Sequence, residues 1–453
     1  MKYLILCAGL LLAACAPMPP TGPMAPEEDA IVLDFPPMRS FAASSPGGTL
    51  RPNAEITRDF SDLSFRLESG RVLPVFTRFE TPVTVRFNGP APAHIVNDLE
   101  GLLARLRAEA GIDIRSTAGA DANIVIELVN ARQMRQVAPG AACFVVPRVR
   151  DWGELRRNRN SPVIDWTTLQ MRDRAAVFMP DNSTPQEMRD CLHEELAQAL
   201  GPLNDLYRLP DSVFNDDNMH AVLTPFDMLI LRVTYAPELS SGMSQAEVMA
   251  LVPRILARLN PAGEGMRGQA PQETTRDWMA AIQVALGGSG ASPAARRQEA
   301  ARAIAIGQAR GWSDVRTGFA QYVFGRLQLS NDPGLALGAF TTAIAAYQGD
   351  PNLRIHAAQV DVQRAAFALI ARDSDAVLAL TGPAITVARR HENAALLSLL
   401  MMFRAEALDL QGQTEAAMAL RLDSLGWGLY GFGSRDQVVD RLNEIASLPR
   451  PPS

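Results

Sequence analysis

The sequence nearly lacks lysine, and it is poor in histidine and cysteine. Lys2 is its one lysine, so arginine supplies almost all of the 43 basic residues. Against 49 acidic residues, these leave a mild net charge of −6. The chain shows no basic patch with interleaved aromatic residues, which argues against nucleic acid as a partner.

Beyond the N-terminus, the chain lacks an apolar run long enough to span a bilayer. It opens with Met1-Lys2-Tyr3, followed by an apolar run over 4–14 and then Cys15. A positive charge, a short apolar run and small residues before a cleavage point are the parts of a secretory signal. The run is too short for a stable membrane-spanning helix. Residues 1–14 are therefore predicted to be a signal peptide.

The boundary Leu12-Ala13-Ala14-Cys15 resembles the lipobox of bacterial lipoproteins. In that family, a diacylglycerol is attached to the cysteine and the signal is cleaved before it. The alternative is an ordinary signal peptide with an incidental cysteine. The resemblance implies that Cys15 is lipidated and that the chain is anchored on a membrane of the cell envelope, facing the periplasm. Ala16 favours the outer membrane, because enteric lipoproteins retained in the inner membrane carry Asp there.

Only four cysteines occur, and two of them belong to the signal and the lipid site. Cys143 and Cys191 remain. A disulfide between them is the expected outcome in an oxidising compartment. It would close a loop of roughly 50 residues, worth about 4 kcal/mol in the chain-entropy model. Two buried thiols, or one reactive thiol, are the alternatives.

Composition divides the chain into segments. Residues 15–50 are rich in Pro, Ala, Ser and Gly, and they are predicted to form a lipidated flexible tether. Residues 51–240 mix strand and helix patterns. Residues 241–294 read as a connector with short helices, residues 295–446 as a helical domain, and residues 447–453 as a tail.

The first of the two large segments predicts an α+β fold with a mixed sheet. Residues 84–87, 123–128, 143–146 and 175–179 have the alternating or continuous apolar character of strands. Residues 93–110 carry apolar side chains at helical spacing.

The second large segment is almost entirely helical in pattern. Turn signals stand at Gly311, 331–334, 349–351, 382–383 and Gly412, and they predict about four helical hairpins.

Two parts of this second segment resemble the second helix of a tetratricopeptide repeat. Their matching residues are Ala336, Phe340 and Ala343 in one part, and Ala405, Leu408, Gly412 and Ala417 in the other. The resemblance implies a stack of hairpins that binds a protein partner on its concave face. The alternative is a plain helical domain that packs on its neighbour.

A helix over 185–200 is the most informative segment. Thr184 and Glu187 form a capping-box pattern around Pro185 at the first helical position. Gly201 followed by Pro202 ends the helix.

This helix carries a spacing that resembles the zincin metallopeptidases and their metzincin branch. Those families have His-Glu-x-x-His on a helix, extended in metzincins by x-x-Gly-x-x-His. The matching positions here are Glu195 for the general base, Glu194, Gln198 and Asn204 for the metal ligands, Gly201 for the turn and Asp205 after it. Residues 223–235 resemble the segment that packs beneath the metal site in several metzincins. The resemblance implies a zincin-like fold over about 80–240, in a domain of unknown function found in putative proteobacterial lipoproteins.

The ligand chemistry departs from these families. Zinc prefers imidazole, thiolate or carboxylate ligands, and the amides of Gln198 and Asn204 are weak substitutes. A harder ion such as calcium wants more oxygens than this set offers. His193 lies about 100° from Glu194 around the helix and cannot easily join the same ion. No cofactor is therefore expected, and Glu195 remains a catalytic candidate only if a metal binds.

A dense acidic loop follows the helix. It contains Asp216 and Asp217, and His220 comes shortly after. The loop could bring carboxylates toward Glu194, although such a run commonly caps its own backbone.

Three functions are compatible with these patterns. A non-catalytic binding module or adaptor of the envelope is favoured, because the metallopeptidase spacing survives while the ligand chemistry does not. A metal-dependent peptidase or hydrolase, in which Glu195 activates water, is the second. A purely structural lipoprotein is the third.

Overall fold

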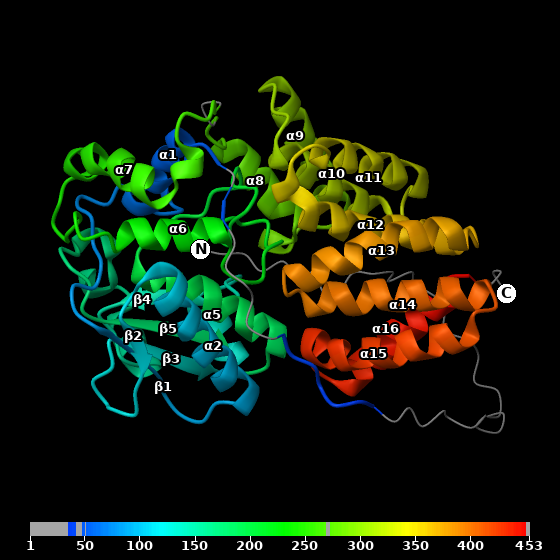
Figure 1. The fold of residues 1–453 in the computed structure, drawn as a ribbon, viewed down its shortest axis with the longest axis horizontal. Coiled ribbons are helices and arrows are strands. Elements are labelled where there is room, and N and C mark those ends of the chain that lie inside the picture. Colours follow the sequence, from blue (N-terminus) through cyan, green and yellow to red (C-terminus); the bar gives the residue numbers. More distant parts are fainter. Residues whose placement is uncertain (1–34, 42–47, 50, 269–271, 450–453) are drawn as a thin grey trace.

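The computed structural model describes residues 35–41, 48–49, 51–268 and 272–449. A mixed α/β domain and an array of helices lie side by side (Figure 1). The predicted signal peptide, Cys15 and most of the predicted tether lie outside the described residues. Among the helices of the described ranges, none has the length and apolar character that a membrane span requires.

A five-stranded mixed sheet organises the first domain. Its strands are β1 (Val83–Phe87), β2 (Ile114–Ser116), β3 (Ile124–Val129), β4 (Phe144–Pro147) and β5 (Ala175–Pro180). The order is β2-β1-β3-β5-β4, and only the edge strand β4 runs antiparallel to its neighbour. The structure confirms the strands predicted near 84, 123, 143 and 175. The three-residue β2 was not predicted, because it is too short to show alternation.

Helices cover both faces of this sheet. They are α1 (Asn53–Phe65), α2 (Ala93–Ala110), α3 (Ala131–Val137), α4 (Trp152–Asn158), α5 (Pro185–Leu200), α6 (Pro225–Thr234) and α7 (Gln245–Leu259). The larger core joins one face of the sheet to α1, α2, α5, α6 and α7. A smaller core on the other face joins Val146 and Phe178 to α3 and α4. Because α7 packs on α1 and α6, the first domain extends beyond the boundary predicted at 240.

The second part of the chain is entirely helical where the structure describes it. Its helices are α8 (Arg276–Ala285), α9 (Pro293–Ala309), α10 (Val315–Gln328), α11 (Pro333–Tyr347), α12 (Arg354–Ile370), α13 (Ser374–Arg390), α14 (Ala394–Leu410), α15 (Thr414–Phe432) and α16 (Arg435–Ser447). Successive helices pack in pairs, from α8 with α9 to α14 with α15. We call α8–α16 the helical array. It begins about twenty residues before the predicted boundary at 295, because α8 packs mainly on α9.

One predicted turn is wrong. Gly382 and Pro383 lie inside α13, which continues to Arg390. Val377, Thr381, Ala384 and Ala388 are buried along one face of this helix, on both sides of the proline. Their packing sustains the helix across the hydrogen bond that proline cannot donate.

Residues 35–41 pack along α15 and differ in this respect from the predicted free tether over 15–50. The Arg39 N–H donates to the Gly426 carbonyl at 3.0 Å, and the Phe41 ring lies 4.6 Å from the Trp427 ring. A Cβ atom at Gly426 would lie 3.1 Å from the Pro37 carbonyl oxygen. The segment is therefore seated on a surface that glycine keeps open.

Candidate functional site

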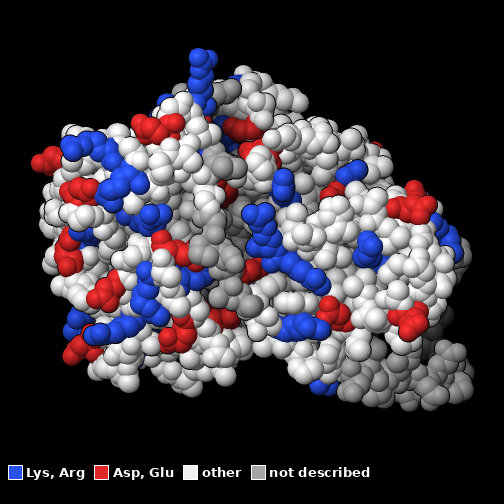
Figure 2. Space-filling view, viewed as in Figure 1, with Lys and Arg blue, Asp and Glu red and all other residues white. Residues whose placement is uncertain are grey.

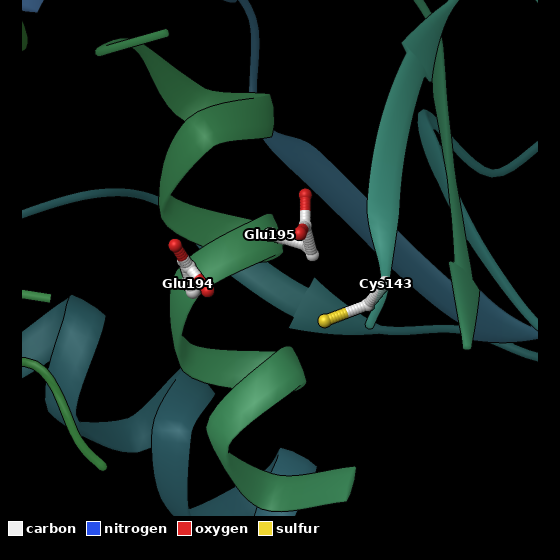
Figure 3. A group of neighbouring side chains, drawn as sticks. All are labelled: Cys143, Glu194 and Glu195. Carbon is white, nitrogen blue, oxygen red and sulfur yellow. The ribbon is translucent and has the colours of Figure 1, made fainter. Parts of the chain in front are cut away.

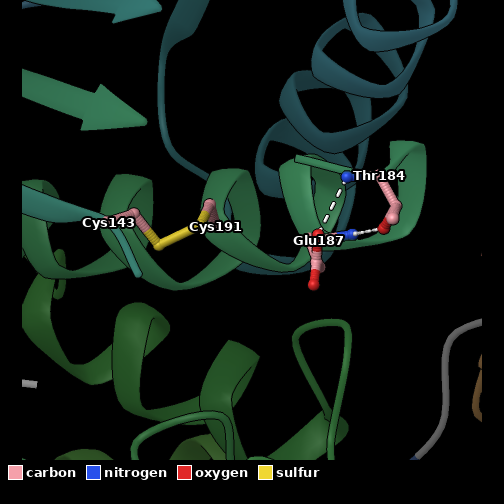
Figure 4. The surroundings of a disulfide bond; sticks show 4 residues. All are labelled: Cys143, Thr184, Glu187 and Cys191. Carbon is pink, nitrogen blue, oxygen red and sulfur yellow. Dashed lines mark hydrogen bonds between the residues drawn. A yellow bond between two sulfur atoms is a disulfide. The ribbon is translucent and has the colours of Figure 1, made fainter. Parts of the chain in front are cut away.

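The candidate site is built on α5, whose N-terminus is fixed by local contacts. The Thr184 N–H donates to the Glu187 carboxylate at 2.8 Å, and the Glu187 N–H donates to the Thr184 hydroxyl at 3.2 Å (Figure 4). Pro185 occupies the first helical position. This reciprocal capping box confirms the predicted helix start.

A disulfide joins α5 to the sheet. Cys191 of α5 is bonded to Cys143, directly before β4, with their Cα atoms 5.9 Å apart (Figure 4). The predicted disulfide is thus confirmed. It closes a long loop that includes β5, so the helix and the edge strand of the sheet stay together.

An arginine that sequence reasoning missed caps the other end of α5. Arg172 is buried and donates to the carbonyls of Gln198 at 2.5 Å, Ala199 at 2.7 Å and Gly201. A cation at this position also complements the negative end of the helix dipole. Burial lowers the pKa of Arg172 to about 10, which leaves it charged at neutral pH. No local pattern links residue 172 to residues 198–201, so the contact emerges only in three dimensions.

Helix α6 packs closely beneath the end of α5. A Cβ atom at Gly201 would lie 2.8 Å from the Thr234 methyl group, so glycine is required for this approach. The Tyr235 hydroxyl donates to the Leu200 carbonyl at 3.1 Å. The end of the segment 223–235 therefore packs against the C-terminal end of α5.

Two of the predicted metal-ligand residues, Gln198 and Asn204, make hydrogen bonds to different parts of the fold. The Gln198 amide donates to the Asp205 carboxylate, with distances of 3.2 and 3.4 Å to its two oxygens. The Asn204 amide instead donates to the Asp62 carbonyl on α1 at 3.0 Å. Both amide side chains are buried. Internal hydrogen bonds thus commit the amide nitrogens of two of the three residues predicted as ligands and fix the orientation of their side chains.

One group of potential metal ligands does form on α5. Ligand atoms of Glu194, Glu195 and Cys143 lie within 4.8 Å of one another (Figure 3). Glu195 is fully buried, whereas Glu194 is half-buried. Because Cys143 is part of the disulfide, its sulfur is not a thiolate, and two carboxylates remain. Structural and catalytic zinc sites use at least three protein ligands, so this group does not fit zinc in its oxidised form.

His193 points into the first domain and serves the fold. Its Nδ1 accepts a hydrogen bond from the Leu223 N–H at 3.1 Å. Burial, together with Arg189 and Arg105, holds the pKa of His193 well below its usual value of 6.5. The imidazole is therefore neutral and links α5 to the start of α6.

The acidic loop organises itself and the helical array rather than a metal. Asp217 accepts from the Met219 N–H at 3.0 Å, from the Asn215 amide at 2.9 Å and from His356 of α12 at 2.8 Å. His220 meets the Pro210 carbonyl at 3.1 Å, and Asp216 is half-buried. Neither aspartate belongs to the group around Glu194, so this loop does what the backbone-capping alternative predicted.

The helical array covers the first two turns of α5. Arg189 forms an ion pair with Glu392, between α13 and α14, and approaches Asp98 of α2 at 3.8 Å. Gln186 donates to Asn393 at 3.1 Å and accepts from the Ala395 N–H at 2.9 Å. The first turns of α5 are thus built into an interface between the two parts of the chain.

The loop after α5 packs on the helical array. Tyr207 lies 5.0 Å from the Trp278 ring on α8 and 6.0 Å from the Phe319 ring on α10. Met219 is buried in the same cluster. Helices α8 and α10 therefore pack against a loop of the first domain.

These features define a mixed α/β domain against which an all-helical array packs. Within this chain, residues 53–254 match the family described as "Protein of unknown function (DUF2927)". The match begins with α1 and ends within α7, which agrees with the structural boundary of the first domain. It fits the domain of unknown function that the sequence predicted. No curated protein and no solved structure matches the chain.

Proposed function

We propose that the protein is a non-catalytic binding module or adaptor of the bacterial cell envelope, held on a membrane by lipid on Cys15. The observation that carries this proposal is which residues occupy the metallopeptidase-like positions on and after α5, and which bonds those residues make. Gln198 and Asn204 are buried and engaged in internal hydrogen bonds, and Cys143 is in a disulfide. A metal-dependent hydrolase needs about three protein ligands to hold the ion that activates water, and the amides of Gln198 and Asn204 are weak ligands for zinc.

A zincin-like ancestry for the first domain is part of the proposal. Glu195 and Gly201 retain their spacing on α5, and α6 packs beneath them. The mixed sheet places its antiparallel edge strand beside the same helix. These features support a metallopeptidase-like scaffold that has lost its ligands.

The adaptor part of the proposal assigns partner binding to the outside of the helical array. Its paired helices support a relationship to tetratricopeptide repeats, and the loop around Tyr207 already covers part of α8. Charges of both signs are interspersed on the face drawn in Figure 2, with broad uncharged areas over the array. Such a surface suits a protein partner better than a polyanion.

Metal analysis of the purified oxidised chain tests the non-catalytic assignment. We expect far less than one equivalent of any divalent ion, and no peptidase activity above that of the Glu195→Gln variant. A stoichiometric ion that is lost in a Glu194→Ala variant would contradict the proposal and favour the hydrolase in which Glu195 activates water. The clustering of Glu194, Glu195 and Cys143 is the observation behind that second candidate.

Photo-crosslinking on intact membranes tests the adaptor assignment. A crosslinking residue is placed at Leu335 of α11 or Met418 of α15, which are 52% and 63% exposed, and at Val72 of the first domain, which is 57% exposed. We expect one partner protein to be captured from the array positions and not from Val72. Capture from none of these positions would favour the structural lipoprotein. A Cys15→Ser variant should lose the membrane fraction altogether.

A further inference from the structure

Three side chains with metal-binding chemistry gather where α5 faces the start of β4, and Cys191 is bonded to one of them, Cys143. Cys191, Glu194 and Glu195 follow one another on α5 at positions i, i+3 and i+4, which places them around one side of the helix. Cys143 comes from the strand side, bonded to Cys191. In Figure 3 the Cys143 sulfur points toward the helix that carries both glutamates. The ligand atoms of Cys143, Glu194 and Glu195 lie within 4.8 Å of one another.

The backbone that presents these side chains is fixed at both ends. The capping box at Thr184 and the Arg172 contacts hold α5, and β4 is paired with β5 along its whole length. Cys143 and Cys191 are 2% and 5% exposed, and Glu195 is fully buried. Half-buried Glu194 is the member of the group that reaches toward solvent. The scaffold would therefore remain in place if the bond between the sulfurs were broken.

Two thiolates and two carboxylates form a suitable donor set for zinc. Zinc in proteins takes four ligands in a tetrahedron, with Zn–S near 2.3 Å and Zn–O near 2.0–2.2 Å, so two thiolates on one ion lie about 3.8 Å apart. Side-chain rotations of neighbouring cysteines cover such a separation without backbone movement. In the oxidised chain neither sulfur can act as a thiolate, so the same residues form no zinc site.

We propose that reduction of the disulfide between Cys143 and Cys191 creates a zinc site completed by Glu194 and Glu195. A dithiol reductant attacks the disulfide by thiol–disulfide exchange, is itself oxidised to a disulfide, and leaves two thiols on the protein. Zn²⁺ then binds both sulfurs and releases their two protons. This goes beyond the proposed function, which concerns the oxidised chain, and gives the metallopeptidase-like helix a metal in one redox state only.

Metal titration of the full chain in both redox states tests the proposal. The oxidised and the phosphine-reduced protein are each titrated with Zn²⁺ against a chromophoric chelator, and with Co²⁺ under an inert atmosphere. We expect one equivalent of Zn²⁺ in the reduced protein alone. We also expect the Co²⁺ form to show thiolate charge-transfer bands and the intense visible bands of a tetrahedral site. Equal binding in both states, or no binding after reduction, would overturn the proposal. Stoichiometric metal in the oxidised protein would instead count against the proposed function.

Matched variants assign the ligands. Glu194→Gln and Glu195→Gln should each weaken Zn²⁺ binding to the reduced protein at least about tenfold, since even second-shell changes cost that much. Cys143→Ser should also lower the intensity of the thiolate bands, because only the Cys191 sulfur remains. Glu100→Gln, at an exposed position on α2, is the control and should bind normally. Circular dichroism of each variant checks that α5 is intact, and unchanged affinity in both glutamate variants would reject the site.

Discussion

At the scale of single residues, Asp227 shows how burial sets a pH dependence. It is fully buried and accepts from the Ser212 hydroxyl at 2.5 Å, the Val213 N–H at 3.1 Å and the Thr224 N–H at 2.8 Å. Burial is the largest cause of its shift and raises the pKa to about 7, despite these hydrogen bonds. The folded state favours the protonated acid. The contribution of Asp227 to the free energy of unfolding is therefore fully present below its ordinary pKa near 4 and is lost as pH rises through 7.

The Asp227→Asn variant should therefore flatten part of this pH profile. The amide oxygen can accept from both backbone N–H groups, and its NH₂ group can donate to Ser212. We expect the variant to gain stability relative to the native chain as pH rises from 4 to 7, by at most about 1.4 kcal/mol per pH unit. Denaturant unfolding at both pH values measures the difference. Asp121→Asn, at an exposed position, is the control and should leave the profile unchanged.

Arg172 is the second residue whose removal has a definite consequence. Arg172→Ala would leave the carbonyls of Gln198, Ala199 and Gly201 buried without their donor. We expect a loss of about 3–5 kcal/mol in the free energy of unfolding. Arg172→Lys should recover part of it, and the nearby Arg174→Ala should cost less than about 0.5 kcal/mol. A cost below about 1 kcal/mol for Arg172→Ala would show that the helix end does not depend on this cap.

At the scale of elements, the N-terminal segment 35–41 and α15 form a testable contact. Gly426→Val should displace the segment, because its first added carbon would lie 2.9 Å from the Arg39 side chain and 3.1 Å from the Pro37 carbonyl. We expect faster proteolysis between residues 35 and 41 while the array stays folded. Gly338→Val on α11, where the added carbon meets open space, provides the matched control. Equal proteolysis of both variants would mean that the segment is not held through this surface.

The elements that sequence predicted are those whose signals are local. The capping box at Thr184 and Glu187, the apolar runs of β3 and β5, and the turn at 331–334 all act within a few residues. Helix α1 was not predicted, and it buries polar Asn53, Asp59 and Ser64 alongside its apolar residues, which weakens a periodic pattern.

The candidate site was also predictable only in part, because only its local signals can be recognised in the sequence. Glu194 and Glu195 were found by their spacing on one helix, and the disulfide by its compartment. The engagement of Gln198 by Asp205, the Arg172 cap and the coverage of α5 by Glu392 depend on residues brought together by the fold. No periodicity encodes such pairs.

At the scale of the whole molecule, three of the five histidines gather between the two parts of the chain. The His220 ring lies 5.7 Å from the His356 ring on α12 and 5.4 Å from the His391 ring after α13. Within the described ranges, these three residues do not bring their ligand nitrogens within 4.8 Å of one another, so they form no ready metal site. Their proximity therefore has its main consequence in proton binding.

Docking of the helical array should weaken in acid. Burial, followed by neighbouring histidines, lowers the pKa of His220 to about 4 and that of His391 to about 3. Asp217 opposes the lowering of the His220 pKa, whereas Arg390 adds to the lowering of the His391 pKa. The Tyr347 ring lies 5.3 Å from the His356 ring. When the array is undocked, these histidines regain a pKa near 6.5. Their contribution to the stability of the docked state is therefore complete above pH 6.5 and is lost as pH falls toward 4.

Between pH 6.5 and pH 5, these two histidines should reduce the docking equilibrium constant by up to about a thousandfold, since each changes it at most tenfold per pH unit. Fluorescence energy transfer between probes on the first domain and on the array would report the separation. His220→Gln combined with His391→Gln should keep the two parts docked at pH 5, because glutamine preserves polarity and does not titrate. His94→Gln, on α2, is the control and should follow the native chain. Loss of energy transfer at the same pH in the doubly substituted chain would show that other groups release the array.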